Sequence, residues 1–144
     1  MNETQVARMD PRPLSAKHLV VCVDDDASVL SALRRLLRGE PYEFISTDST
    51  EAALDLVRTR DVSLIIADFR MPEMSGTGLL QLVKSCSPKT VRVLLTGYPR
   101  ATWVVQAQER DLMHGVYGKP WENEELKQTI LKWLRDLEER SDAG

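Results

Sequence analysis

Acidic, hydroxyl and ammonium side chains follow four apolar runs in this sequence. They are Asp24, Asp25, Asp68, Thr96 and Lys119. Carboxylate oxygens are ligands that Mg²⁺ prefers, while a hydroxyl and an ammonium can both bind phosphoryl oxygens. If these side chains share one site, the sequence predicts that it holds a divalent cation and a phosphoryl group.

The polar residues stand where short apolar runs end, which predicts that they meet at one edge of a sheet. The apolar runs cover residues 19–23, 64–67, 91–95 and 115–118. Runs of this kind, separated by amphipathic stretches of helix length, are typical of buried parallel strands. In an open parallel sheet, ligands bind outside the carboxyl ends of the strands. We therefore expect the carboxylates, the hydroxyl and the ammonium to converge there.

Five β–α units account for the chain from residue 17 onward. A weaker strand is expected over residues 42–47, and helical spacing predicts helices over residues 29–37, 52–57, 78–86, 103–107 and 123–137. Asp26 is expected only to cap the first helix. Right-handed crossovers place helices on both faces of the sheet. The sequence thus predicts an α/β fold: a single, doubly wound, five-stranded parallel sheet with five helices.

Length, composition and net charge limit the number of domains and the kinds of partner that the chain can have. The 144 residues fit one domain, which we expect over residues 17–140, between a flexible arm (1–16) and a short tail (141–144). The net charge of −3 gives no electrostatic case for nucleic-acid binding. No apolar run approaches the ~20 residues of a membrane span. The N-terminus lacks the apolar region of a secretory signal, so a cytoplasmic location is expected.

The cysteines, histidines and tryptophans offer no second site. Cys22 and Cys86 form no metal-binding pattern, and His18 and His114 are expected to be structural or surface residues. The three tryptophans are expected to anchor the core or an interface.

In their order and spacing, the polar residues resemble the receiver domain of bacterial two-component response regulators. The shared motifs are Asp-Asp after the first strand, Asp-x-x-Met-Pro-x-x-x-Gly from Asp68, Thr96 after the fourth strand and Lys-Pro at residues 119–120. The resemblance covers about residues 17–137. It implies a flavodoxin-like fold with strand order 2-1-3-4-5.

The resemblance also implies a role for each side chain. Asp68 matches the phospho-acceptor, and Thr96 and Lys119 match the residues that contact the phosphoryl oxygens. Asp24 and Asp25 match the acidic pair that holds Mg²⁺, the cofactor we expect, directly or through water.

The preference of Mg²⁺ for oxygen ligands suggests how this chain would hold it. Asp25, Asp68 and the backbone carbonyl of Arg70 could supply three ligands, and Asp24 could hold a water bound to the metal.

The implied partners are a sensor histidine kinase or a phosphotransfer protein as the donor. An output domain or another protein would read the change through the face built from residues 103–107, residues 116–118 and the last helix. A homodimer is left open. The chemistry would be stoichiometric self-phosphorylation, so we do not expect a conventional enzyme.

Two features depart from the family's usual pattern. The aromatic switch residue commonly stands three positions before the lysine, where this chain has Val116; Tyr117 follows it and should point to the opposite face of the strand. The candidate switch residues are therefore Thr96, Val116 and Tyr117. The second departure is a pair of large side chains near the site: Arg70 stands two positions after Asp68, and Tyr98 stands two positions after Thr96. We hypothesise that these two side chains shield the acyl phosphate from water.

Two other functions compete with this interpretation. A phosphatase of the haloacid dehalogenase type would use an Asp-x-Asp motif at residues 24–26 with Thr96 and Lys119, but it needs a later acidic pair and leaves the motif at Asp68 unexplained. The other is a binding module with the receiver fold that is never phosphorylated. The full acceptor set argues against it without excluding it.

Overall fold

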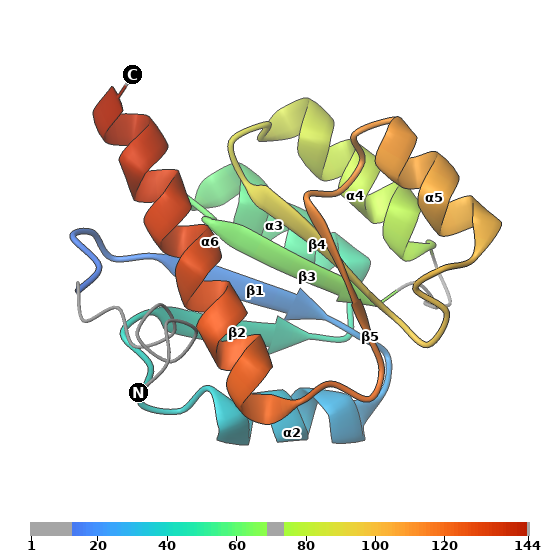
Figure 1. Ribbon diagram of the computed structural model, residues 1–144, viewed down its shortest axis with the longest axis horizontal. Helices are drawn as coiled ribbons and strands as arrows, with labels where there is room; N and C mark the ends of the chain where they lie inside the picture. The colour runs from blue at the N-terminus through green and yellow to red at the C-terminus, as the bar shows by residue number, and fades with distance from the viewer. Residues whose placement is uncertain (1–12, 69–73, 144) are drawn as a thin grey trace, which may run out of the picture.

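The protein is described by a computed structural model for residues 13–68 and 74–143, with side chains described through residue 140. These residues form a parallel five-stranded sheet in the order β2-β1-β3-β4-β5, which confirms the predicted topology (Figure 1). The strands are β1 (Leu19–Val23), β2 (Glu43–Thr47), β3 (Leu64–Asp68), β4 (Val91–Thr96) and β5 (Gly115–Gly118).

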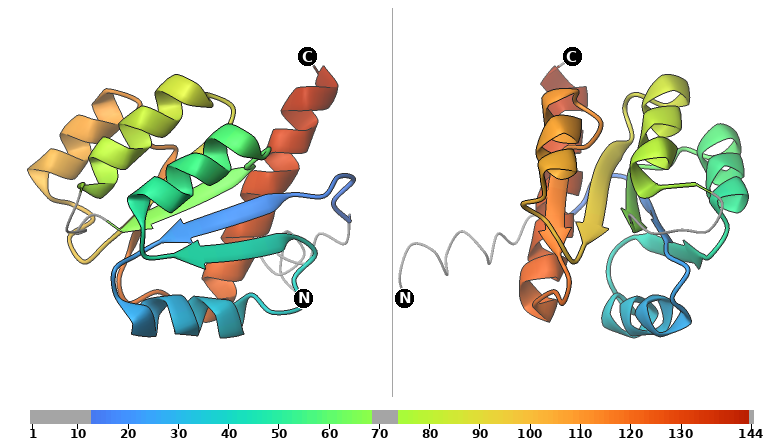
Figure 2. Two further views of the ribbon diagram at one scale, coloured as in Figure 1. Left: turned by 180° about the vertical axis from the view of Figure 1, so that it is seen from behind. Right: turned by 90° about the vertical axis from the view of Figure 1, so that its right-hand side faces the viewer.

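The described helices cover both faces of the sheet, as right-handed crossovers require. They are α2 (Ala27–Leu36), α3 (Thr50–Thr59), α4 (Gly76–Cys86), α5 (Thr102–Glu109) and α6 (Asn123–Ala143). Helices α3, α4 and α5 pack on one face, and α2 and α6 pack on the other (Figure 2). Within the described residues, no helix is both long and apolar enough to cross a membrane.

The central strands are mostly apolar because helices cover both of their sides. Every residue of β1, β3 and β4 is buried. Alternation along β1 sends Val21 into the core beneath α3, α4 and α5, and sends Val20 and Cys22 into the core beneath α2 and α6. Cys22 is therefore a small core residue, as the sequence predicts, and burial raises the pKa of its thiol.

Short polar residues begin the helices that follow β1, β2 and β3. The carboxylate of Asp26 accepts a hydrogen bond from the Ser28 N–H at 2.9 Å, which confirms its predicted role as the α2 cap. Ser49 caps α3 in the same way, and Ser75 caps α4. At most three residues thus separate α2 and α3 from the ends of β1 and β2, so the loops at that part of the carboxyl edge are short.

Both ends of the described chain run beyond the expected limits of the domain. Leu14, from the last part of the expected arm, packs against the core beneath α2 and α6. The backbone N–H groups of Ser15 and Ala16 donate to the Glu138 carboxylate at 3.0–3.1 Å. Helix α6 continues to Ala143, through most of the expected tail. Residues 1–12 lie outside the described chain.

Candidate functional site

A cavity of about 350 Å³ opens at the carboxyl edge of the sheet, where the arrows of Figure 1 end. Its lining brings together the strand-end residues and the loops beside them: Asp24, Asp25, Asp26, Asp68, Thr96, Gly97, Tyr98, Trp103 and Lys119. The described chain therefore places all five polar residues singled out in the sequence in one cavity. Parallel strands end at a common edge, which is the physical reason for this convergence.

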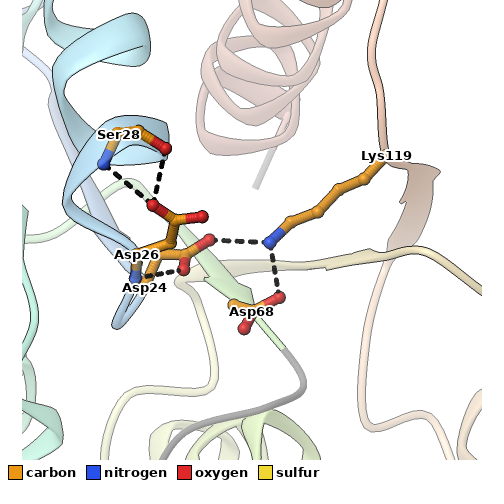
Figure 3. A network of polar contacts seen from close by, with 5 residues as sticks. All are labelled: Asp24, Asp26, Ser28, Asp68 and Lys119. Atoms are coloured by element: carbon orange, nitrogen blue, oxygen red, sulfur yellow. Dashed lines mark hydrogen bonds and ion pairs between the residues drawn. The ribbon is translucent and has the colours of Figure 1, made fainter.

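Asp24 directly follows β1 and has only 1% of its surface exposed. Its Oδ1 accepts the Asp26 backbone N–H at 2.9 Å, and its Oδ2 accepts a hydrogen bond from Lys119 Nζ at 2.9 Å (Figure 3). Burial raises the pKa of this carboxyl, although both hydrogen bonds favour the ionised form. Asp24 is thus a buried carboxylate held in place through both oxygens.

Lys119 lies between two carboxylates that come from different strands. Its Nζ donates to Asp68 Oδ1 at 2.8 Å as well as to Asp24, so one ammonium spans the ends of β1 and β3 (Figure 3). Its backbone N–H donates to the Thr96 carbonyl at 2.9 Å, which fixes the start of the side chain beside β4. Burial disfavours the ammonium, but the hydrogen bonds to Asp68 and Asp24 outweigh it and raise the pKa of Lys119. The lysine is therefore charged.

The acidic residues fit a hard divalent cation. One carboxylate oxygen from each of Asp24, Asp25 and Asp68 lies within 4.8 Å of the other two. Asp24 and Asp68 are buried, whereas Asp25 is exposed to solvent. Mg²⁺ takes oxygen ligands and usually keeps several waters, so one open side suits it. Arg70, whose carbonyl is the remaining predicted ligand, lies outside the described residues.

Thr96 ends β4 beside this cluster and is 3% exposed. Its Oγ1 accepts the backbone N–H of Tyr98 at 3.1 Å, which turns the chain after β4, where Gly97 and Tyr98 line the cavity. Because Oγ1 is the acceptor in this bond, the hydroxyl proton can still be donated to another group. The cavity thus combines four carboxylates, three of which cluster within 4.8 Å, with a charged ammonium and a hydroxyl.

This arrangement agrees with what the chain matches among known proteins. The response regulator receiver domain family matches residues 20–131. The chain belongs to this family. The match includes the motif that begins at Asp68, and it decides against the phosphatase alternative.

The receiver domain is similar in sequence to parts of longer transcriptional regulatory proteins. It is 29% identical to the hydrogenase transcriptional regulatory protein HoxA of Bradyrhizobium diazoefficiens over 81% of the chain and 24% of that protein. It is 32% identical to the transcriptional regulatory protein ZraR of Escherichia coli O157:H7 over 80% of the chain and 26% of that protein. The chain thus spans about a quarter of the length of these curated relatives.

A crystal structure confirms the likeness in three dimensions. The signal receiver domain of an HD domain-containing protein from Pseudomonas fluorescens Pf-5 superposes with a TM-score of 0.82 at 26% identity. The superposition covers 93% of this chain and 98% of that one.

In this receiver domain, the two candidate switch residues point to opposite faces of β5, as alternation predicts. Val116 packs against the core beneath α3, α4 and α5. Tyr117 packs on the other side, where its Oη accepts a hydrogen bond from Trp133 Nε1 of α6 at 3.4 Å. The tyrosine is thus engaged with α6 on the face opposite Val116. A switch role for Thr96, Val116 or Tyr117 stays a prediction.

Sequence reasoning missed one large side chain at the site. Trp103 lines the cavity, whereas the sequence assigns it only to the core or an interface. The available signal was its place early in the helix that follows the Thr96 loop, since such residues face the carboxyl edge of the sheet. Tyr98 also lines the cavity, but 63% of its surface is exposed.

Proposed function

We propose that the receiver domain accepts a phosphoryl group on Asp68 from a histidine kinase or a phosphotransfer protein, with Mg²⁺ held by Asp24, Asp25, Asp68 and the Arg70 carbonyl. The observation that carries this proposal is the position of Lys119 Nζ, 2.8 Å from Asp68 and 2.9 Å from Asp24, beside three clustered carboxylates. This cluster gathers negative charge that a cation must balance when a phosphoryl group arrives.

The proposed transfer moves one phosphoryl group between two side chains. A carboxylate oxygen of Asp68 attacks the phosphorus of the donor phosphohistidine, forming a P–O bond as the P–N bond breaks and the imidazole leaves with its electron pair. Lys119 neutralises part of the charge on the equatorial oxygens, and Thr96 donates its hydroxyl proton to one of them. Mg²⁺ held by Asp24, Asp25 and Asp68 would supply further positive charge beside the phosphoryl oxygens. Asp24 orients Lys119 through the 2.9 Å hydrogen bond.

The proposed output is a change in partner preference rather than a released product. We place it on the face built from α5, β5 and α6, which begins at the site through Lys119 and the loop after Thr96. An output domain, another protein or a second copy of the chain could bind there. Since phosphorylation is stoichiometric, the receiver domain does not act as a conventional enzyme. The alternative remains a binding module that is never phosphorylated.

Intact-mass measurement after incubation with acetyl phosphate and Mg²⁺ tests the proposal. We expect an adduct of about 80 Da on the wild type, the mass of one phosphoryl group. Asp68→Asn should abolish the adduct, because an amide oxygen is a poor nucleophile. Asp55→Asn is the matched control, since Asp55 is exposed on α3, away from the cavity lining, and should leave the adduct unchanged. A wild type that stays unmodified would support the alternative, a binding module that is never phosphorylated.

A further inference from the structure

Trp103 is the best-anchored apolar group of the described cavity lining. It is the second residue of α5, and its partly buried ring packs against the core beneath α3, α4 and α5. Its neighbours on the helix, Val104 and Ala107, are 0% and 5% exposed. The backbone N–H groups of Val104 and Val105 donate to the Ala101 carbonyl at 3.0 and 3.2 Å, which closes the first turn. The core contacts of the indole therefore hold it beside the cavity.

Tyr98 lines the same cavity but is held differently. Its side chain belongs to the loop between β4 and α5, and 63% of its surface is exposed to solvent. Trp103 is buried on one side by the core and borders the cavity on the other. A ring packed against the core excludes water from the space beside it, whereas a mostly exposed ring is itself surrounded by water.

We infer that the Trp103 indole is the wall that protects the Asp68 acyl phosphate from hydrolysis. The inference rests on the proposed function. It identifies Trp103 as a residue that sets the lifetime of the phosphorylated state. In hydrolysis, a water oxygen attacks phosphorus, forming a new P–O bond as the bond to the Asp68 oxygen breaks. Carboxylate, hydrogen phosphate and one proton are released.

An apolar wall slows this reaction because an attacking water must be held by polar groups. A bound water usually makes two to four hydrogen bonds. The indole face offers such a water no hydrogen-bond acceptor, and the ring forms part of the wall of the cavity of about 350 Å³. The carboxylates and Lys119 lie on the strand ends, so Trp103 limits the access of water from the side of α5.

The lifetime of the acyl phosphate tests the inference. Protein phosphorylated with acetyl phosphate is freed of the donor by desalting, and loss of the adduct is followed by intact mass. Trp103→Ala and Trp103→Gln should each lose the phosphoryl group several-fold faster than the wild type, and Gln fastest because its amide can bind the attacking water. Trp103→Phe should retain most of the lifetime, because a phenyl ring still fills the wall.

Controls separate this role from a structural one and from failure of the proposed function. Trp133→Phe changes a tryptophan that packs on Gly115 rather than at the cavity, and it should leave the lifetime unchanged. Equal lifetimes for the wild type, Trp103→Ala and Trp103→Gln would overturn the inference while leaving phosphorylation of Asp68 intact. A wild type that forms no adduct would instead defeat the proposed function.

A second measurement leaves Trp103 unsubstituted, so it tests the inference even if the Trp103 variants do not fold. In the protein Trp121→Phe/Trp133→Phe, Trp103 is the remaining tryptophan of the sequence. Its fluorescence should become harder to quench with acrylamide once Asp68 carries the phosphoryl group, because that group then covers the indole face. Unchanged quenching on a protein shown by mass to be phosphorylated would overturn the inference.

Discussion

At the scale of single residues, Lys119 decides the electrostatics of the site. Asp24 is buried, and Asp68 comes from the neighbouring strand, so their carboxylates would repel each other without a cation between them. Lys119 Nζ reaches both at 2.8–2.9 Å. The same ammonium is in position to contact a phosphoryl group on Asp68. One residue thus serves both the resting site and the proposed reaction.

Replacing Lys119 should therefore destabilise the metal-free protein. We expect Lys119→Ala to lower the free energy of unfolding at pH 7 by about 2 kcal/mol, less than for a fully buried pair because the lysine side chain is 25% exposed. Mg²⁺ should restore more stability to this variant than to the wild type, since the cation replaces the lost charge. Urea unfolding with and without Mg²⁺ measures both effects.

Lys89→Ala provides the comparison for this experiment, because Lys89 is exposed in the loop before β4. It should change the free energy of unfolding little under either condition. If Lys119→Ala were as stable as the wild type without Mg²⁺, the balance of charge described for the site would be wrong.

At the scale of elements, β5 and α6 are joined by close packing around Trp133. A Cβ placed on Gly115 would lie 3.1 Å from Cζ2 of the Trp133 ring. The same indole donates to Tyr117 Oη at 3.4 Å and meets the His114 ring edge-on at a centroid distance of 6.2 Å. Glycine at position 115 therefore lets α6 approach the strand that ends in Lys119.

Gly115→Ala should disturb this contact. We expect a loss of about 1–2 kcal/mol in the free energy of unfolding, because the methyl group overpacks against a rigid ring. In a Trp133→Leu background, the same substitution should cost much less, which a double-mutant cycle of denaturant unfolding measures. Gly97→Ala is the matched control, since a Cβ there meets nothing within 4 Å. Additive effects at positions 115 and 133 would contradict the proposed contact.

At the scale of the whole molecule, a small polar network ties the two ends of the described chain together. His18, before β1, bonds through Nδ1 to Ser63 Oγ at 2.7 Å and through Nε2 to Glu138 of α6 at 2.6 Å. Glu138 also accepts the backbone N–H groups of Ser15 and Ala16. The network fixes the second half of α6 against the strand ends opposite the cavity.

This network predicts an acid-sensitive contribution to stability. Burial disfavours the Glu138 carboxylate, but the hydrogen bonds from Ser15, His18 and Ala16 outweigh it and lower its pKa from 4.5 to about 2. Because the folded-state pKa lies below the unfolded one, the stabilisation is present above about pH 4.5 and is lost as the pH falls towards 2.

Glu138→Gln removes the charge and should cost about 1–2 kcal/mol at pH 7. The difference in unfolding free energy between the wild type and this variant should shrink below pH 4.5, the usual pKa of this carboxyl. Urea unfolding across pH 2–7 measures this difference. Glu109→Gln, at the exposed end of α5, serves as the reference and should differ little from the wild type throughout. A pH-independent difference for Glu138→Gln would contradict the assigned network.

The order of apolar runs and polar residues along the chain was enough to predict the sheet and the acidic cluster at its edge. Apolar runs such as 64–67 mark buried strands through local composition, and parallel strands bring their final residues to one edge. Asp24, Asp68 and Lys119 could therefore be placed together from their positions in the chain. The opposite orientations of Val116 and Tyr117 also followed, since side chains alternate along a strand.

How side chains from distant elements meet could be seen only in the folded chain. Helix orientations and side-chain rotamers decide three such contacts. Lys119 bonds two carboxylates, Trp103 borders the cavity, and Glu138 binds residues more than 100 positions away. Local periodicity says which face of an element is buried, but it does not say which residue from another element lies against that face. Such contacts are set by packing of the whole chain, because each one depends on the placement of all the others.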